Sequence, residues 1–104
     1  MRLPQLDVLQ NYADGIAKEI NAKHLPVLRW LNRTDDCSMA GLTDTHIHNI
    51  DVSGQKAGTI CVNPLRLGND KRGWRWAIAH ETCHLNARNC DLPEFTELMR
   101  GLGF

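Results

Sequence analysis

The five residues His80-Glu81-Thr82-Cys83-His84 constrain this chain more than any other stretch. They form a HExxH pattern, in which two histidines four residues apart can bind one metal ion on a helix while the glutamate acts as a general base. At about 100° per residue, His80 and His84 are about 40° apart around the helix axis, and Glu81 is about 60° beyond His84. We therefore expect a helix, from about Lys71 to Ala87, that is apolar over most of its circumference and interrupted by these polar residues.

Periodicity and turn signals elsewhere predict an α+β fold. An amphipathic helix should follow Pro4 and reach about Ala22, and a last helix should begin near Pro93 and stop at Gly101. Short apolar or alternating segments predict strands at residues 27–31, 39–42, 46–52 and 58–62.

A catalytic zinc ion usually has three protein ligands and one open position, so a third ligand is required besides His80 and His84. Four candidates follow the motif, and spacing alone does not choose among them. The alternative role of Asp91 is to cap the last helix, and that of Cys90 is to pack as a small buried hydrophobe. The two glutamates are more typical of first-turn or surface charges. The candidates are Cys90, Asp91, Glu94 and Glu97.

The run AHETCHL, followed by a turn and then by PEF at the start of a short helix, resembles the SprT-like (Spartan-type) zincin metallopeptidases. The upstream segment GTICVNPLRL is also similar to a strand of that family. The resemblance covers about Ala57 to Gly101. Alignment on the PEF segment puts Asp91 where the family has its third histidine, which is the main departure from the family pattern.

The resemblance implies a small zincin-like α+β domain with an N-terminal helix, a three- to four-stranded sheet, the HExxH helix and a short C-terminal helix. It implies Zn²⁺ bound by His80, His84 and Asp91, with Glu81 as general base in the hydrolysis of a protein or peptide substrate. The strand at residues 58–62 should then line the cleft and offer an edge to the substrate. An aspartate ligand lowers the charge of the site and weakens zinc as a Lewis acid.

Two alternatives to a peptidase remain open. One is a non-catalytic zincin-fold module that keeps a structural metal and recognises a protein or DNA partner, and the other is a metal-dependent hydrolase that acts on another substrate. The chain has twelve basic and twelve acidic residues, so no overall field favours nucleic acid. We interpret Trp74 and Trp76 as core residues and the neighbouring basic side chains as solvated, and we expect no basic patch. Family members that act on DNA carry added DNA-binding parts, for which this chain has no room.

At 104 residues the chain is expected to form a single domain, residues 1–104. It has no recognisable signal peptide or membrane segment, and its four cysteines lack CxxC spacing, so a reducing cytoplasmic location is expected. His46 and His48 face the same side of a predicted strand, and we interpret them as part of a solvated face rather than as metal ligands.

Overall fold

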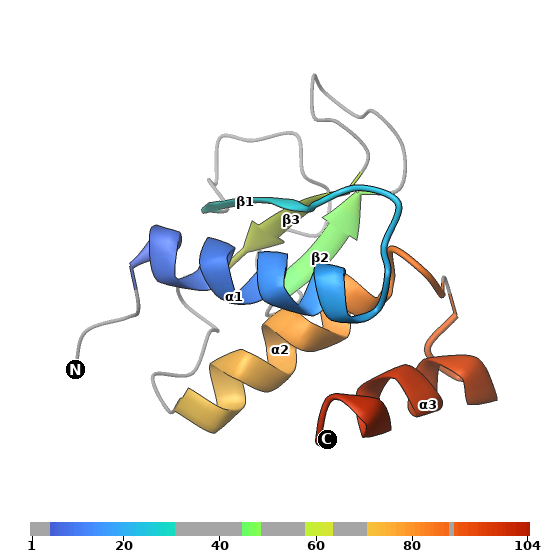
Figure 1. Cartoon of the computed structure of the whole chain (residues 1–104). Coiled ribbons are helices and arrows are strands. Elements are labelled where there is room, and N and C mark those ends of the chain that lie inside the picture. Colours follow the sequence, from blue (N-terminus) through green and yellow to red (C-terminus); the bar gives the residue numbers. More distant parts are fainter. Residues whose placement is uncertain (1–4, 31–44, 49–57, 64–70, 88) are drawn as a thin grey trace.

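The computed structural model describes residues 5–30, 45–48, 58–63, 71–87 and 89–104. In these ranges three helices and a three-stranded sheet form an α+β arrangement, which confirms the predicted class. Figure 1 shows α1 and α2 lying along the sheet, with α3 beyond α2. In chain order the elements are α1 (Leu6–Glu19), β1 (Val27–Trp30), β2 (Thr45–His48), β3 (Thr59–Val62), α2 (Lys71–Cys83) and α3 (Pro93–Gly101).

The sheet has the strand order β1-β3-β2, so β3 is its central strand. β1 pairs with β3 in parallel and β2 pairs with it antiparallel, which places Leu28 and Ile47 on either side of Ile60. All four residues of β3 are buried, as its apolar sequence predicts. The expectation that this strand offers an edge to a substrate is wrong, because its backbone is paired on both sides. The predicted strand at residues 39–42 lies outside the described residues.

Helix α1 ends three residues earlier than its periodicity predicts. The backbone of Asn21 is left-handed (φ 56°). The Ala22 N–H donates to the Ala17 carbonyl at 2.9 Å, and the Asn21 N–H donates to the Lys18 carbonyl at 3.2 Å. These two bonds form a Schellman closure, for which asparagine is a common alternative to glycine. The closure turns the chain toward β1.

The side chain of Gln10 connects α1 to the start of β1. Its Nε2 donates to the carbonyl of Pro26 at 2.9 Å, and its Oε1 accepts the N–H of Leu28 at 2.9 Å. One amide thus satisfies a donor and an acceptor of the strand backbone, so α1 is held against the sheet in a defined register.

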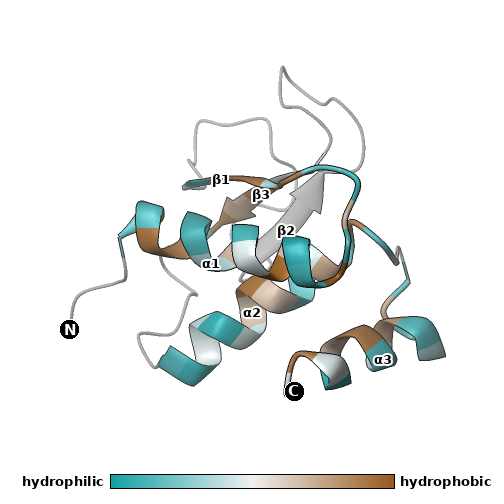
Figure 2. Ribbon diagram, viewed as in Figure 1, coloured by the Kyte–Doolittle hydropathy of each residue, from teal (hydrophilic) through white to brown (hydrophobic). Residues whose placement is uncertain are grey.

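Two groups of buried apolar side chains surround α2. The first joins α1, the sheet and the middle of α2, and the second joins the end of α1, the second half of α2 and α3. Figure 2 shows hydrophilic colouring at the start of α2 and hydrophobic colouring further along it, where both groups meet the helix. Helix α2 is therefore the central packing element. The first group includes Leu9, Leu28, Ile60, Trp74 and Ile78, and the second includes Ile16, Ala79, Cys83, Phe95 and Met99.

The α-helical part of α2 stops at Cys83 instead of reaching Ala87 as predicted. From His84 to Asn86 the backbone bonds span three residues, as from the N–H of His84 to the carbonyl of Glu81, and only the N–H of Ala87 donates across four, to the carbonyl of Cys83. This tighter closure is common at helix ends. Among the described helices, none has both the length and the apolar character needed to cross a bilayer.

Neighbouring positions in α1 test this packing. Leu9→Ala removes a side chain that is 0% exposed and should lower the free energy of unfolding by about 2–5 kcal/mol. Val8→Ala changes a side chain that is 46% exposed and should cost less than about 0.5 kcal/mol. Urea denaturation of the metal-free protein measures both, and equal losses would contradict the described orientation of α1.

Candidate metal centre

The two motif histidines lie on one side of the C-terminal end of α2. Their ring centroids are 5.1 Å apart, with an interplanar angle of 82°. His80 belongs to the last full turn of α2, and His84 is the first residue after the helix. Although the final turn is tighter than an α-helical turn, it keeps both imidazoles together, as the four-residue spacing predicts.

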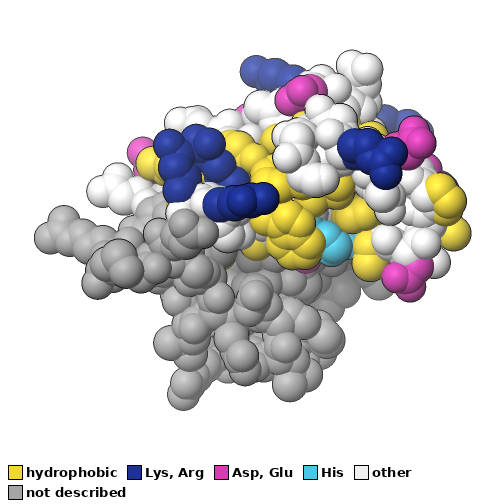
Figure 3. All heavy atoms as spheres, turned by 90° about the horizontal axis from the view of Figure 1, so that it is seen from below, with side chains coloured by type: hydrophobic (Ala, Val, Ile, Leu, Met, Phe, Trp, Pro, Cys, Tyr) yellow, Lys and Arg dark blue, Asp and Glu magenta, His cyan; other side chains and the backbone are white. Residues whose placement is uncertain are grey.

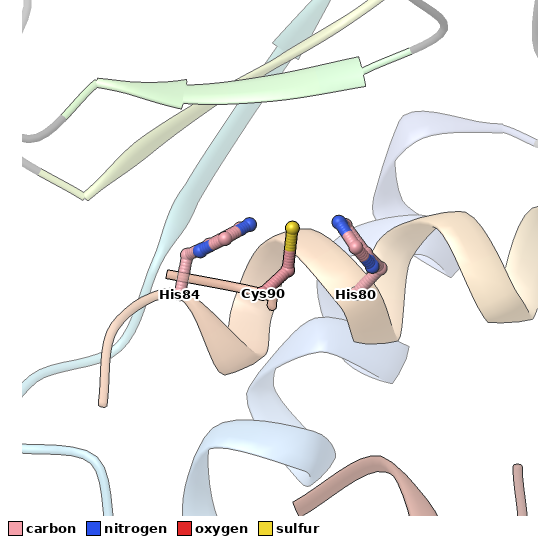
Figure 4. Close-up of side chains that lie close together, drawn as sticks. All are labelled: His80, His84 and Cys90. Atoms are coloured by element: carbon pink, nitrogen blue, oxygen red, sulfur yellow. The ribbon is translucent and has the colours of Figure 1, made fainter. Parts of the chain in front are cut away.

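Cys90 is the third potential ligand that the structure brings to this pair. One nitrogen of His80, one nitrogen of His84 and the Cys90 sulfur all lie within 4.8 Å of one another. Figure 4 shows the thiol between the two imidazoles, with all three side chains pointing in the same direction. In a tetrahedral zinc site, bonds of about 2.0–2.3 Å put donor atoms about 3.3–3.8 Å apart. The group therefore needs to contract by only about 1 Å to hold an ion.

The other candidate ligands occupy different positions. Asp91 is exposed and does not belong to the His80, His84 and Cys90 group. It does not cap α3 either, since the N-cap is Leu92, which makes no side-chain capping bond, and Pro93 begins the helix. The N–H of Asp91 instead donates to Oδ1 of Asn89 at 2.9 Å. Glu94 and Glu97 are exposed on α3, as expected for solvated charges.

Cys90 is exposed, so the interpretation of this residue as a small buried hydrophobe is wrong. Cys83, inside the motif, is buried, and burial raises its pKa to about 11. Its sulfur contacts the sulfur of Met99 at 3.7 Å, within the second apolar group. Cys83 therefore serves as a packing residue, whereas solvent and ions can reach Cys90.

A backbone contact orients His84. Its Nδ1 lies 3.0 Å from the carbonyl oxygen of Ala87. Because a carbonyl only accepts hydrogen bonds, Nδ1 carries the proton and the lone pair of Nε2 remains for an ion. A bond of this kind to the second ring nitrogen is typical of metal-binding histidines.

Aromatic side chains hold the two imidazoles in place. The ring of Phe95, at the start of α3, lies 4.9 Å from the ring of His80 and 4.8 Å from that of His84. The ring of Trp76 stacks on that of His80, with ring centroids 4.9 Å apart and an interplanar angle of 25°. Trp76 is nevertheless 49% exposed, so the interpretation of both tryptophans as core residues is correct only for Trp74.

The pKa of His80 is lowered, first because the ring is partly buried and second because a positive charge on His84 disfavours another nearby. A lowered pKa keeps the His80 imidazole neutral at mildly acidic pH. Since only the neutral ring binds a metal, this part of the site is ready for an ion at neutral pH.

Glu81, the predicted general base, lies on α2 between the two histidines in sequence, but its carboxylate is not in the group formed by His80, His84 and Cys90. Its side chain is only 8% exposed. The next residue, Thr82, is fully buried and donates its hydroxyl to the carbonyl of Ile78 at 2.7 Å. Glu81 and Thr82 therefore belong to the buried side of α2. His46 and His48 lie in β2, but their side chains are outside the described residues.

Comparison with protein-family models, curated proteins and solved structures finds no match for this chain.

The lowered pKa of His80 gives a prediction for the metal-free protein. Between the folded pKa and the ordinary value of 6.5, the unfolded chain binds more protons than the folded chain, so stability falls as the pH is lowered through this window. His80→Gln removes this contribution. With a chelator present, the free energy of unfolding of the wild type should decrease relative to that of the variant between about pH 7.5 and pH 5. A difference that does not change with pH would contradict the described environment of His80.

Proposed function

We propose that this chain is a zinc-dependent, metallopeptidase-like hydrolase of zincin type. The observation that carries this proposal is the convergence of one nitrogen of His80, one nitrogen of His84 and the sulfur of Cys90 within 4.8 Å. Two nitrogens and a thiolate match the ligand preferences of zinc. Glu81, on the same helix, supplies the remaining group that HExxH chemistry requires.

In this proposal Cys90 is the third ligand, and the prediction that Asp91 has this role is the alternative. The exposed thiol of Cys90 lies close to the two imidazoles, whereas the carboxylate of the following residue, Asp91, is not in this group. Either ligand brings one negative charge, so the net charge of a loaded site is the same in both cases. The two versions differ in the donor atom and are therefore easy to distinguish.

Zinc, when bound, acts as a Lewis acid and lowers the pKa of a coordinated water toward neutrality. The role of the chain is to orient the groups around that ion. Ala87 fixes the tautomer of His84, Phe95 packs against both imidazoles, and Glu81 accepts the proton of the attacking water before passing it to the leaving amine. The low exposure of Glu81 shields this proton transfer from bulk solvent.

The ligand assignment predicts a contrast between two adjacent exposed residues. Cys90→Ser should weaken zinc binding by at least about tenfold, because it removes a donor, while Asp91→Asn should change the affinity by less than about twofold. Competition with a chromophoric chelator measures both affinities. Loss of zinc from Asp91→Asn alone would assign the third position to the carboxylate.

The catalytic assignment predicts the effect of Glu81→Gln. This variant should keep one zinc ion per chain and should lower hydrolysis of an unfolded protein substrate by about 10²–10⁴-fold, the usual contribution of a general base. Glu97→Gln, on the exposed side of α3, is the matched control and should cleave like the wild type. Peptide products are counted by mass spectrometry. A zinc-loaded wild type that produces no peptides would contradict the enzyme and favour the non-catalytic binding module.

A further inference from the structure

Three basic side chains gather at the beginning of α2. Lys71, Arg72 and Arg75 line an open pocket of about 520 Å³, together with Tyr12 of α1 and residues 102–104 after α3. Among the described residues that line this pocket, none is an aspartate or a glutamate. Because the whole chain has a formal net charge of zero, the positive charge here is a local concentration. The sequence pattern had predicted no such basic patch.

These cations lack counter-ions in the part of the chain that the structure describes. Nothing there forms an ion pair with Lys71, Arg72 or Arg75. The Nε of Arg75 is also buried without a hydrogen-bond acceptor. A buried donor that has lost water without gaining a partner destabilises the protein, and a charged group does so more than a neutral one. An anion in the pocket would offset this cost by neutralising the guanidinium.

The position of Arg75 is fixed before any ligand arrives. Its Cζ lies 5.4 Å from the ring centroid of Tyr12 and 5.7 Å from that of Trp74, so aromatic faces hold the guanidinium. A prearranged group loses less conformational entropy on binding. The first turn of α2 contains no acidic residue, and cations at this end of a helix oppose its dipole. Their placement is thus unfavourable for the free protein and favourable for binding an anion.

Residues of the pocket and of the metal centre share one side of α2. Arg72, Trp76 and His80 follow one another at four-residue intervals, so they lie within about 80° around the helix axis. The exposed ring of Trp76 stacks on His80. Figure 3 shows lysine and arginine side chains beside a hydrophobic surface that reaches a histidine. Arg72 and His80 are separated by about 12 Å along the axis, a length that an extended peptide spans with three or four residues.

We propose that Lys71, Arg72 and Arg75 form a subsite for an aspartate or glutamate of the substrate, three or four residues from the bond at the metal centre. The exposed face of Trp76 accepts an apolar side chain between the two. This inference rests on the proposed peptidase function and adds a substrate class to it, namely peptides that combine an apolar residue with a nearby acidic residue. A carboxylate is the matching ligand, because guanidinium groups bind it through paired hydrogen bonds.

The test measures binding separately from cleavage. The zinc-loaded Glu81→Gln protein is titrated with fluorescent peptides that carry a phenylalanine and, three or four residues away on either side, two glutamates. Twin peptides carry two glutamines instead. We expect the acidic peptides to bind about tenfold more tightly than their twins, with a preference that decreases as salt is added. The double variant Lys71→Gln/Arg72→Gln, which changes only exposed side chains, should reduce the preference to less than about twofold.

Two further variants complete the test. Arg75→Gln should also remove the preference, and circular dichroism shows whether its packing against Tyr12 is kept. Lys23→Gln makes the same charge change at an exposed residue outside the pocket and should leave the preference intact. Equal binding of acidic and neutral peptides, or a preference that survives the double variant, would overturn the proposal. So would stronger displacement of the peptide by inorganic phosphate or a single-stranded oligonucleotide than by free glutamate peptides.

Failure of this subsite can be distinguished from failure of the enzyme. Wild-type protein that cleaves peptides without regard to acidic residues would overturn the subsite and leave the hydrolase standing. Charge-selective binding by a zinc-loaded wild type that cleaves nothing would support the subsite and contradict the hydrolase.

Discussion

The position of α2 is the constraint on which the rest of this structure depends. The helix packs against the sheet, α1 and α3, so most of its circumference is buried. The side that carries His80 and His84 is less buried, and there the ring of Phe95 contacts both imidazoles. Since Phe95 also belongs to the second apolar group, the packing of α3 and the orientation of the two histidines depend on each other. A change in one therefore affects the other.

The two ends of α2 lie beside different groups of side chains. At the C-terminal end the two motif histidines meet the thiol of Cys90, which comes from the turn before α3, and the N-terminal end presents cations without ion-pair partners in the described part of the chain. Trp76 lies between them, half exposed and stacked on His80. The helix holds Arg72, Trp76 and His80 at fixed distances from one another. We therefore regard α2 as the central packing element of the fold and, in the proposed function, as the helix along which a substrate would bind.

Patterns within one element predicted much of this arrangement. Four-residue spacing predicted that His80 and His84 would lie together, and the apolar run of β3 predicted its burial. Contacts between elements were harder to predict. No periodicity indicates that β3 is central, that Cys90 returns to the histidines, or that Trp76 stays exposed, because each depends on how α3 and β2 pack around α2. The asparagine at position 21 is a sequence signal for the end of α1, because asparagine readily adopts the left-handed conformation that closes a helix.

X-ray absorption at the zinc edge, on protein loaded with one equivalent of zinc, tests the central claim most directly, because it identifies the donor atoms. We predict one sulfur at about 2.3 Å and two imidazole nitrogens at about 2.0 Å, with any remaining ligand an oxygen. A shell made only of nitrogen and oxygen would show that Cys90 does not bind the ion. The described convergence of the thiol on His80 and His84 would then have no role in the metal site.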